Sequence, residues 1–447
     1  MHPHSINTQR LSGWGNSPVE SCAVWPLHVP GDAARIIPLA PSLIAYGGGR
    51  SYGDAALNPP GTAKTGALNS FIAVDDATGI TTVEAGVTLR DVLDAMVPRG
   101  WFLPVIPGTQ FATIGGALAA NVHGKNHLRM GDFARHVLSF DLTLASGETV
   151  SCSLEINPEL WHATISGLGM TGIIENVTLQ LMPIQSARME VAYTACDSIE
   201  AMLAQFEAQR DCAEYLVGWV DHFARGAQLG RGIVEAARHV AVADGSLAAH
   251  RPTRSALNVP FFAPSFTLNR YSMALYNAHR FRQALKTPTR TVGFAHFFHP
   301  LDGIGHWNRL YGKRGLLQYQ FIVPDGASLR PILEALQQAN QFSFLAVLKA
   351  HGEGNGLMGF SRPGYSLALD FPNTPAVHSL LDSIDQLVLA AGGRVYLAKD
   401  ARLKRDVFKA MYAHALPQWR ATLKAFDPTG YFMSSMGRRL GFKEYAS

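Results

Sequence analysis

The stretch AYGGGRSYGDAALN (residues 45–58) places four glycines in one short loop, and Pro59 and Pro60 follow it directly. Glycine permits positive φ angles and lets the main chain approach another group closely. Successive free backbone N–H groups in such a loop form a cradle for an anion. We therefore predict that this loop binds phosphate through its backbone, although a tight surface turn is the alternative for the loop considered alone.

This loop departs from the two common nucleotide-binding motifs. Position 52, where the third glycine of GxGxxG would fall, is Tyr, and Pro59-Pro60 prevents the helix that must follow. The GK[ST] end of a P-loop is also missing. The loop is therefore not a standard Rossmann or P-loop site, and it would hold phosphate through its backbone amides.

Two more stretches are rich in glycine and poor in bulky side chains. They are PGTQFATIGGALAANVHGKN (107–126) and SGLGMTGIIENVTL (166–179). In the first of them, Ala117, Ala119 and Ala120 leave room for a flat group against the backbone. Three such loops in the amino-terminal region predict an extended ligand with a diphosphate and a planar ring.

The composition predicts a globular protein of at least two domains. The chain has 447 residues, 47% hydrophobic and 16% charged, with a net charge of +4. This mild basicity does not indicate nucleic acid, but it is compatible with a phosphate-bearing ligand or an anionic membrane surface. The four cysteines form no CxxC pair, which favours a reducing compartment without a zinc or disulfide framework.

No targeting or membrane-spanning segment is expected. The start MHPHSINTQR lacks a basic region followed by an apolar one, and no window approaches the roughly 18 apolar residues of a transmembrane helix. We therefore expect a cytoplasmic or peripherally membrane-associated protein.

In the amino-terminal half, short strands and helices alternate. Residues 72–86 predict strand, turn and strand, and Thr88 with Asp91 predicts a capping box at the start of a helix before Gly100. Residues 136–153 predict a hairpin that turns at Ser146-Gly147, and 172–184 predicts a further strand.

The alternation of short strands and helices continues after residue 187. Residues 188–196, 316–324 and 365–371 predict strands, and the segment after Asp197 predicts a helix with Asp197 and Glu200 at its start. Further helices are expected after Ser328, from Thr374-Pro375 to Gly392-Gly393, and from Asp400 after a strand at VYLA. Residues 225–290 are expected to be loops and lid material. Both regions mix helices with short strands, so the fold class is α+β.

The glycine-rich stretches, in this order, resemble the vanillyl-alcohol-oxidase (PCMH-type) flavoproteins. The blocks HFFHPLDGIGHWNRLYGKRGLLQYQFIVP (296–324) and GGRVYLAKDAR (392–402) are similar to the more specific decaprenylphosphoryl-β-D-ribose 2′-oxidase family. The resemblance covers nearly the whole chain except roughly 225–290. It implies a PCMH-type FAD-binding domain (1–187), an antiparallel-sheet substrate domain (188–393) and a carboxyl-terminal segment (394–447) that returns to the FAD domain.

The resemblance implies FAD as the cofactor. Its pyrophosphate would meet the backbone of 47–53 and the Ser51 side chain, its ring system would lie along 115–123, and its adenine end would contact Gly172 and Ile174. Many relatives attach the flavin through a His in the first loop. Because Arg50 occupies that position, we predict non-covalent FAD. The predicted cofactor-binding residues are Gly47, Gly48, Gly49, Arg50, Ser51, Tyr52, Gly53, Gly108, Thr109, Thr113, Gly115, Gly116, Asn121, His123, Gly124, Gly172, Ile174 and Lys399.

His123 and His127 could suggest a metal pair, but Gly124 weakens the required helix and no Glu follows His123. We therefore predict no metal. The resemblance puts His123 near the flavin and Lys125 at an anionic group of the substrate. Structural packing of His123 is the alternative.

Lys399 is predicted to be catalytic together with His123. A cation near flavin N1/C2=O stabilises the reduced ring, and the matching Lys of the family contacts flavin and substrate. A solvated lysine at a strand end is the alternative interpretation.

Gln318 and Gln320 alternate along one strand, so they share a face that suits the recognition of sugar hydroxyls, unless that face is solvated. Lys349 is a second candidate cation for phosphate, and Tyr52 is carried over as a pocket residue. Tyr52, Lys125, Gln318, Gln320 and Lys349 are therefore the predicted substrate-binding residues.

Three positions depart from the actinobacterial members of the family. Phe298 replaces a Tyr, Ser366-Leu367-Ala368 replaces Asn-Ile-Cys, and Leu128 replaces a second His. Without the cysteine, sensitivity to inhibitors that bond to its thiol should be absent.

The resemblance, together with the retained site residues, implies an FAD-dependent oxidase of the 2′-hydroxyl of a polyprenyl-phosphate pentose. The keto sugar would be reduced to the epimer by a separate NAD(P)H-dependent short-chain reductase, as a pathway partner. The alternatives are an aldonolactone or alditol oxidase that acts on a free small polyol, and a flavin- or lipid-binding protein without turnover. Nucleic acid is not an expected partner, whereas peripheral membrane contact is compatible with the surface charge.

Overall fold

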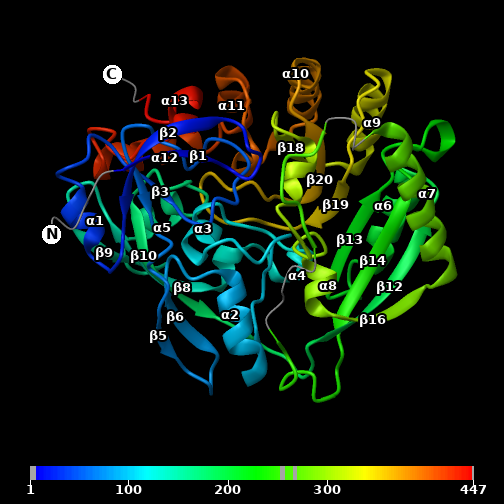
Figure 1. Cartoon of the computed structure of the whole chain (residues 1–447), viewed down its shortest axis with the longest axis horizontal. Coiled ribbons are helices and arrows are strands. Elements are labelled where there is room, and N and C mark those ends of the chain that lie inside the picture. Colours follow the sequence, from blue (N-terminus) through cyan, green and yellow to red (C-terminus); the bar gives the residue numbers. More distant parts are fainter. Residues whose placement is uncertain (1–6, 252–256, 265–268, 445–447) are drawn as a thin grey trace.

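The computed structural model describes residues 7–251, 257–264 and 269–444, and it shows two lobes side by side (Figure 1). The amino-terminal lobe holds a four-stranded sheet of order β1-β2-β4-β3 and a five-stranded sheet of order β5-β6-β10-β8-β9. The strands of these two sheets are β1 (Asn7–Ser12), β2 (Val19–Pro26), β3 (Ile44–Tyr46), β4 (Thr62–Lys64), β5 (Phe71–Val74), β6 (Ile80–Glu84), β8 (Val137–Thr143), β9 (Thr149–Cys152) and β10 (Ile173–Gln180).

Short helices connect and cover these sheets. They are α1 (Asp32–Ile36), α2 (Leu89–Met96), α3 (Ile114–Ala119), α4 (His127–Met130) and α5 (Pro158–Thr164), and the short strands β7 (Trp101–Phe102) and β11 (Met182–Pro183) pair with each other. The predicted capping box is confirmed, because the Thr88 side chain accepts from Asp91 N and the Asp91 carboxylate accepts from Thr88 N. The predicted hairpin at Ser146-Gly147 is also present, as the β8–β9 pair.

The second lobe is built on an eight-stranded antiparallel sheet of order β16-β12-β14-β13-β19-β20-β18-β21. Its strands are β12 (Arg188–Cys196), β13 (Tyr215–Val220), β14 (Gly232–His239), β16 (Thr289–Gly293), β18 (Leu316–Val323), β19 (Ala346–His351), β20 (Gly364–Pro372) and β21 (Arg394–Val395). The α+β class predicted from the sequence is thus confirmed, and the two lobes differ in architecture.

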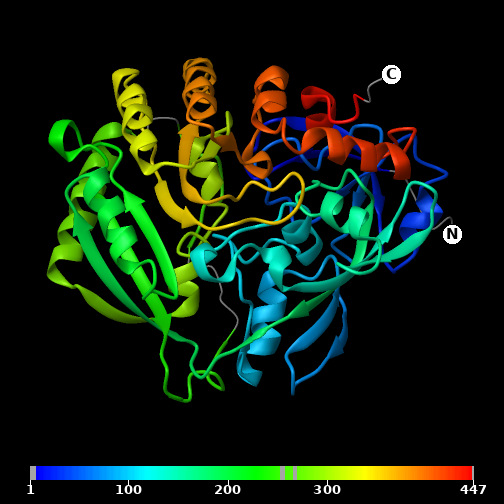
Figure 2. The same ribbon diagram turned by 180° about the vertical axis from the view of Figure 1, so that it is seen from behind.

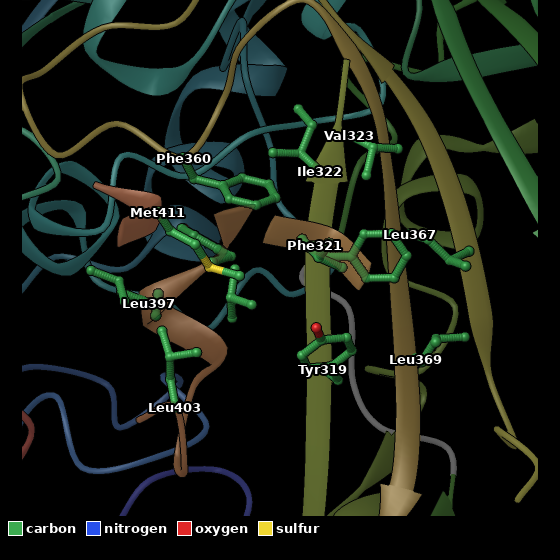
Figure 3. Packing of buried hydrophobic residues seen from close by; sticks show 14 of the residues in the cluster. Tyr319, Phe321, Ile322, Val323, Phe360, Leu367, Leu369, Leu397, Leu403 and Met411 are labelled. Carbon is green, nitrogen blue, oxygen red and sulfur yellow. The ribbon is translucent and has the colours of Figure 1, made fainter. Parts of the chain in front are cut away.

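One face of this sheet is the main hydrophobic core. Helices α6 (Ile199–Gln209), α9 (Leu329–Gln338) and α10 (Pro375–Ala390) cover it. Figure 3 shows Tyr319 and Phe321 of β18 beside Leu367 and Leu369 of β20 in this core. The Tyr319 hydroxyl donates to Asp385 Oδ1 of α10 at 2.9 Å, so this buried ring also keeps a polar partner.

The opposite face carries different residues, and the register identifies them. Trp219, Val347, Ala368 and Gln320 are successive cross-strand partners on β13, β19, β20 and β18. Directly opposed residues point to the same face, so these four residues share it. Helix α7 (Arg270–Lys286) covers the β12–β14 part of this face, and the short helix α8 (Phe294–Phe298) follows it in the chain.

After β21 the chain returns to the amino-terminal lobe. Helices α11 (Arg405–Met411), α12 (Leu416–Phe426) and α13 (Ser435–Leu440) run toward β1 and β2, as both views of the ribbon show (Figures 1 and 2). Ser435 N donates to Leu57 O at 2.7 Å, and the Trp419 indole donates to Ala163 O at 2.9 Å. The last helices thus pack on the first glycine loop and on α5.

Three local predictions are corrected. Residues 225–290 are not only loops, because they contain β14, the 17-residue helix α7 and the start of β16. The cap of α6 is Ser198, not Asp197, because the Ser198 hydroxyl accepts from Ala201 N. The predicted helix does not begin at Asp400: β21 ends at Val395, a 3₁₀ turn spans Leu397–Lys399, and α11 begins at Arg405.

In the described part of the chain, no helix is both long and apolar enough to cross a bilayer. The remaining short strands, β15 (Leu257–Asn258) and β17 (Ile304–Gly305), pair in parallel. They connect the segment before α7 to the segment before β18.

Candidate active site

The first glycine loop is clamped between the second glycine-rich stretch and the carboxyl-terminal segment. A Cβ at Gly48 would lie 2.5 Å from the Phe111 carbonyl oxygen, and a Cβ at Gly53 would lie 2.0 Å from the Asp400 carbonyl oxygen. Tyr52 N donates to Ala398 O at 3.0 Å. Glycine is required at 48 and 53 because the backbone of another segment occupies the space of a side chain.

The same loop presents unpaired donors. Within the described residues, the backbone N–H groups of residues 47–51 donate to no protein acceptor. Gly48 is exposed, and Gly47, Gly49, Arg50 and Ser51 are only partly buried. Successive free N–H groups at an accessible position suit a phosphate or diphosphate. This feature of the structure fits the pyrophosphate of a dinucleotide.

The second stretch contributes a short helix against the sheet. Thr113 caps α3 by accepting from Gly116 N at 3.2 Å, and its Oγ1 lies 2.3 Å from where a Gly47 Cβ would be. Gly108 and Gly116 are exposed, whereas Gly115 is buried, and a Cβ added at Gly115 would lie 2.8 Å from Ala85 Cβ. The first two glycine-rich segments therefore meet at one accessible edge.

Other predicted cofactor residues have structural partners. Asn121 donates to Asn355 O and accepts from Ala134 N, so its side-chain amide holds two protein segments together. Thr109 Oγ1 donates to Asp302 at 3.2 Å. Gly124, Gly172 and Ile174 are buried, and Ile174 lies in β10, on which α3 packs. Their roles toward FAD stay predictions.

Arg50 packs between two aromatic rings. Its guanidinium carbon is 4.3 Å from the Trp14 ring centre and 5.1 Å from the Phe111 ring centre. Burial lowers the pKa of Arg50, although the nearby Asp302 raises it. Since this position carries no imidazole, the first loop offers no histidine for covalent attachment of a flavin.

The face of β18, β19 and β20 that points away from the main hydrophobic core carries three of the predicted substrate residues, Gln318, Gln320 and Lys349. Lys349 is opposite Ser366, and Ser366, Ala368 and Asp370 alternate along β20, opposite Ile322, Gln320 and Gln318. Both glutamines are buried, so the alternative of a solvated strand face is wrong. A single sheet face therefore presents an ammonium group, a carboxylate and two amides together.

His123 joins this face from the amino-terminal lobe. Its Nε2 is 2.8 Å from Gln320 Nε2, which is a donor, so the imidazole accepts there and its proton lies on Nδ1. Burial, followed by the charge of Lys349, lowers the pKa of His123 well below its usual value. His123 is thus neutral near pH 7, and its buried Nδ1 has no partner among the described residues.

Lys399 lies against the first loop and the sheet face. Its Nζ is 5.6 Å from the centre of the Tyr52 ring. Burial lowers the pKa of Lys399 to about 8, and the carboxylate of Asp370 opposes that shift. Lys399 is therefore partly neutral near pH 8, and the alternative of a freely solvated lysine is not what the structure shows.

Asp370 is a site residue that the sequence analysis missed. Gln318 Nε2 donates to its Oδ1 at 2.5 Å, and burial raises the pKa of Asp370 to about 6. The signal was a single acidic residue in the apolar strand YSLALDF, in phase with Ser366 and Ala368. Tyr52, whose pKa burial raises well above its usual value, also faces Asp370 and Gln318.

Two further lysines surround this face. Burial, followed by repulsion from Lys399 and Lys125, lowers the pKa of Lys349 to about 7. Burial lowers the pKa of Lys125 to about 8. The Lys125 ammonium donates to Phe297 O and lies 3.9 Å from the Phe297 ring centre, so a protein partner already holds it. The site is cationic and needs an anion to balance it.

A buried histidine pair lies behind His123. His351 Nε2 is 2.7 Å from Ser366 Oγ, and its ring is 4.6 Å from the His127 ring and 5.0 Å from that of His123. In the described residues, no three His, Cys, Asp or Glu side chains are arranged to hold a metal ion. Ser366, a departure from the family, is thus a partner of His351, and Phe298, another departure, is buried among aromatic rings.

A family model described as an FAD binding domain matches residues 33–153, which contain the first two glycine-rich stretches. The chain is 33% identical to decaprenylphosphoryl-beta-D-ribose oxidase of Mycolicibacterium smegmatis, over 97% of each chain. The chain belongs to the decaprenylphosphoryl-β-D-ribose oxidase family. As a member of this family of flavoproteins it is an FAD-dependent oxidoreductase.

More distant relatives of the family match only part of the chain. A putative D-arabinono-1,4-lactone oxidase of Neurospora crassa is 31% identical over 38% of this chain and 30% of its own length. An L-gulonolactone oxidase of Scyliorhinus torazame is 30% identical over 31% of each chain. The family therefore shares part of its sequence with sugar-lactone oxidases.

Proposed function

We propose that the protein oxidises the 2′-hydroxyl of a pentose carried on a polyprenyl phosphate. The observation that supports this most directly is the sheet face that combines Lys349 with Gln318, Gln320 and Asp370. Amides and a carboxylate suit sugar hydroxyls, and an ammonium group suits a phosphodiester. The near-full-length relative is named for a substrate of this kind.

When bound, FAD supplies the two-electron acceptor for the hydride of the alcohol carbon. The backbone N–H groups of residues 47–51 would hold its diphosphate, and the small residues of α3 would lie beside its ring. The ammonium that Lys399 becomes on accepting the proton of the substrate hydroxyl would stabilise the negative charge that develops on reduction. These assignments describe what the residues of this chain contribute to binding.

Lys399 is the group that we assign to the hydroxyl proton. With a pKa of about 8, a fraction of its amine is neutral near pH 7.5 and can accept a proton. The Nε2 of His123 already accepts from Gln320, so His123 acts as a donor through Nδ1. Asp370 would hold the resulting ammonium, because its carboxylate favours the charged form of Lys399.

Lys349 would bind the phosphodiester, and Lys125, whose ammonium has donors left besides the one used by Phe297 O, would add a second positive charge. A keto sugar on the lipid would result, and a separate NAD(P)H-dependent short-chain reductase would then complete an epimerisation. Oxidation of a free lactone or alditol is the second candidate, because relatives with lactone-oxidase names match 38% and 31% of this chain. A free polyol, however, makes no use of a cation placed for phosphate.

Anaerobic bleaching of the bound flavin tests the proposal. The purified yellow protein is mixed with polyprenyl-phosphoribose, a free pentose, aldonolactones and alditols, and flavin absorbance is followed. Bleaching by the phosphoribose lipid alone, and loss of that preference in Lys349→Met, is expected. Faster bleaching by a free lactone or alditol would establish the second candidate instead, and no bleaching by any alcohol would indicate a binding protein without turnover.

A further inference from the structure

One run of the chain contains no acidic residue. Between Asp244 and Asp302 lie 57 residues with seven Lys or Arg and no Asp or Glu. In the rest of the chain, 34 Asp and Glu outnumber the other 31 Lys and Arg. The net positive charge of the protein is therefore concentrated in this segment, which includes β15, α7 and α8.

Helix α7 in this segment has one face fixed to the sheet. Phe281 and Ala284 pack with Trp219 and Ile233, and Asn277 Nδ2 donates to Asp221 Oδ1 at 2.9 Å. Arg280 belongs to this side as well, since it pairs with Glu235 at 3.2 Å and lies over the Trp219 ring. These contacts hold α7 on the sheet, and the opposite face of the helix takes no part in them.

The other face of α7 is apolar and basic at once. Tyr271, Leu275 and Leu285 are 70%, 72% and 64% exposed, and Arg282 and Lys286 are exposed beside them. In sequence order these five residues are separated by four, seven, three and one positions, which places all of them on one stripe of the helix. Neither Arg282 nor Lys286 forms an ion pair with any described residue. Large exposed apolar side chains of this kind usually mark a contact surface.

A second exposed apolar group lies in the same segment, near the candidate site. Phe261 is 69% exposed and Phe262 is also exposed. Arg309 Nη1 donates to Val259 O and Pro260 O at 3.0 and 2.9 Å, which ties this loop to the turn that follows β17. That turn carries Trp307 and Tyr311, which pack with Tyr52 of the first glycine loop.

Helix α7 and the candidate site lie on the same side of the eight-stranded sheet. Trp219, on which α7 packs, is in cross-strand register with Val347, Ala368 and Gln320, which belong to the site face. Figure 1 shows α7 at the outer edge of this lobe, where no other helix covers it. A flat partner could therefore contact α7 while the site face stays next to it.

We propose that the exposed face of α7, together with Phe261 and Phe262, docks on an anionic lipid bilayer. Interfacial helices bury aromatic and aliphatic side chains at the headgroup boundary and place Lys and Arg at anionic headgroups. The absence of acidic residues from the whole segment complements such a surface. This inference rests on the proposed function in one respect, because a polyprenyl-phosphate substrate resides in such a bilayer.

Flotation with vesicles tests the docking surface on the FAD-loaded full chain. The vesicles are pure phosphatidylcholine, or phosphatidylcholine with roughly one-third phosphatidylglycerol. We expect binding to the anionic vesicles only, weakened roughly 25-fold in the Arg282→Gln/Lys286→Gln double variant, since each basic residue contributes about fivefold. Tyr271→Ser/Leu275→Ser should also lose binding. The matched control is Leu154→Ser/Ile156→Ser, which changes two exposed apolar residues far outside the segment and should bind normally.

An unchanged flavin spectrum establishes that each variant is folded. The docking proposal is overturned if the protein does not bind anionic vesicles, if it binds neutral vesicles equally, or if the α7 variants bind like the control. It is also overturned if size-exclusion chromatography shows a dimer that the α7 variants dissociate, because a second copy then covers this face. Vesicle binding without bleaching by any sugar lipid would reject the proposed function alone, and bleaching without vesicle binding would reject the docking surface alone.

Discussion

Lys399 Nζ lies 5.6 Å from the centre of the Tyr52 ring, so the carboxyl-terminal segment and the first glycine loop meet at one place. Arg439 of α13 links the two segments, because it forms ion pairs with Asp54 Oδ1 of the loop at 2.7 Å and with Asp400 Oδ2 at 2.9 Å. The first glycine loop and the carboxyl-terminal segment thus build the site jointly, although they lie far apart in the sequence.

Replacing Lys399 by Met should slow anaerobic flavin bleaching by roughly 10²- to 10³-fold, because the proton acceptor and the nearby positive charge are both removed. FAD should stay bound, since backbone groups hold its diphosphate. Stopped-flow absorbance measures the rate. The matched control is Lys404→Met, an exposed lysine paired with Asp382 at 2.9 Å, which should bleach normally. A Lys399 variant that bleaches like the control would remove Lys399 from the mechanism.

Replacing Asp370 by Asn should shift the pH dependence of bleaching to lower pH. The carboxylate favours the ammonium form of Lys399, so its loss lowers the pKa of Lys399 below about 8. If neutral Lys399 is the base, the rate rises as pH rises through that pKa, and this rise should begin at lower pH in Asp370→Asn. Asp406→Asn, on the exposed start of α11, is the control. An unchanged profile would contradict the coupling.

Replacing Lys349 by Met should stabilise the substrate-free protein, most strongly below pH 7. The pKa of Lys349 is about 7 when folded, below the 10.5 of a free lysine, so below pH 7 the folded protein holds a charge that burial disfavours. As pH rises from 7 toward 10.5 the folded lysine is neutral and this cost fades. Allowing for partial solvent exposure, we expect a gain of about 1 to 2 kcal/mol at pH 6.

Urea unfolding at pH 6 and pH 9 measures this gain in the free energy of unfolding. Lys313→Met, at an exposed lysine, is the control and should change stability by less than about 0.5 kcal/mol at either pH. Equal stabilisation at both values of pH would show that the effect comes from packing and not from the charge.

Replacing Gly53 by Ala should loosen the contact between the first loop and the carboxyl-terminal segment. The new Cβ would lie 2.0 Å from the Asp400 carbonyl oxygen, which backbone movement alone can relieve. We expect a loss of about 1 to 3 kcal/mol and a lower content of bound FAD. Gly66→Ala is the matched control, because nothing lies within 4 Å of its Cβ. Thermal unfolding and flavin absorbance after gel filtration report both effects.

Local chemistry made several features predictable. The Thr88–Asp91 capping box, the Ser146-Gly147 hairpin and the alternation in 316–324 depend on neighbouring residues, so the sequence pattern alone indicates them. Helix α7 was missed because both of its faces carry apolar side chains. No single apolar stripe therefore marks it as a helix in the sequence. Only the sheet that buries Phe281 defines this helix.

The sequence by itself determined that no Rossmann helix follows the first glycine loop, because glycine spacing and Pro59-Pro60 act within a few residues. Phosphate binding by the main-chain amides of that loop stays a prediction. Tertiary structure decided the chemistry of the site. Asp370, Lys349 and His123 acquire shifted pKa values only when burial and neighbouring charges act on them together, and those neighbours come from distant parts of the chain. Charge and solvation depend on three-dimensional surroundings, which is why Asp370, the carboxylate partner of Lys399, emerged only from the fold.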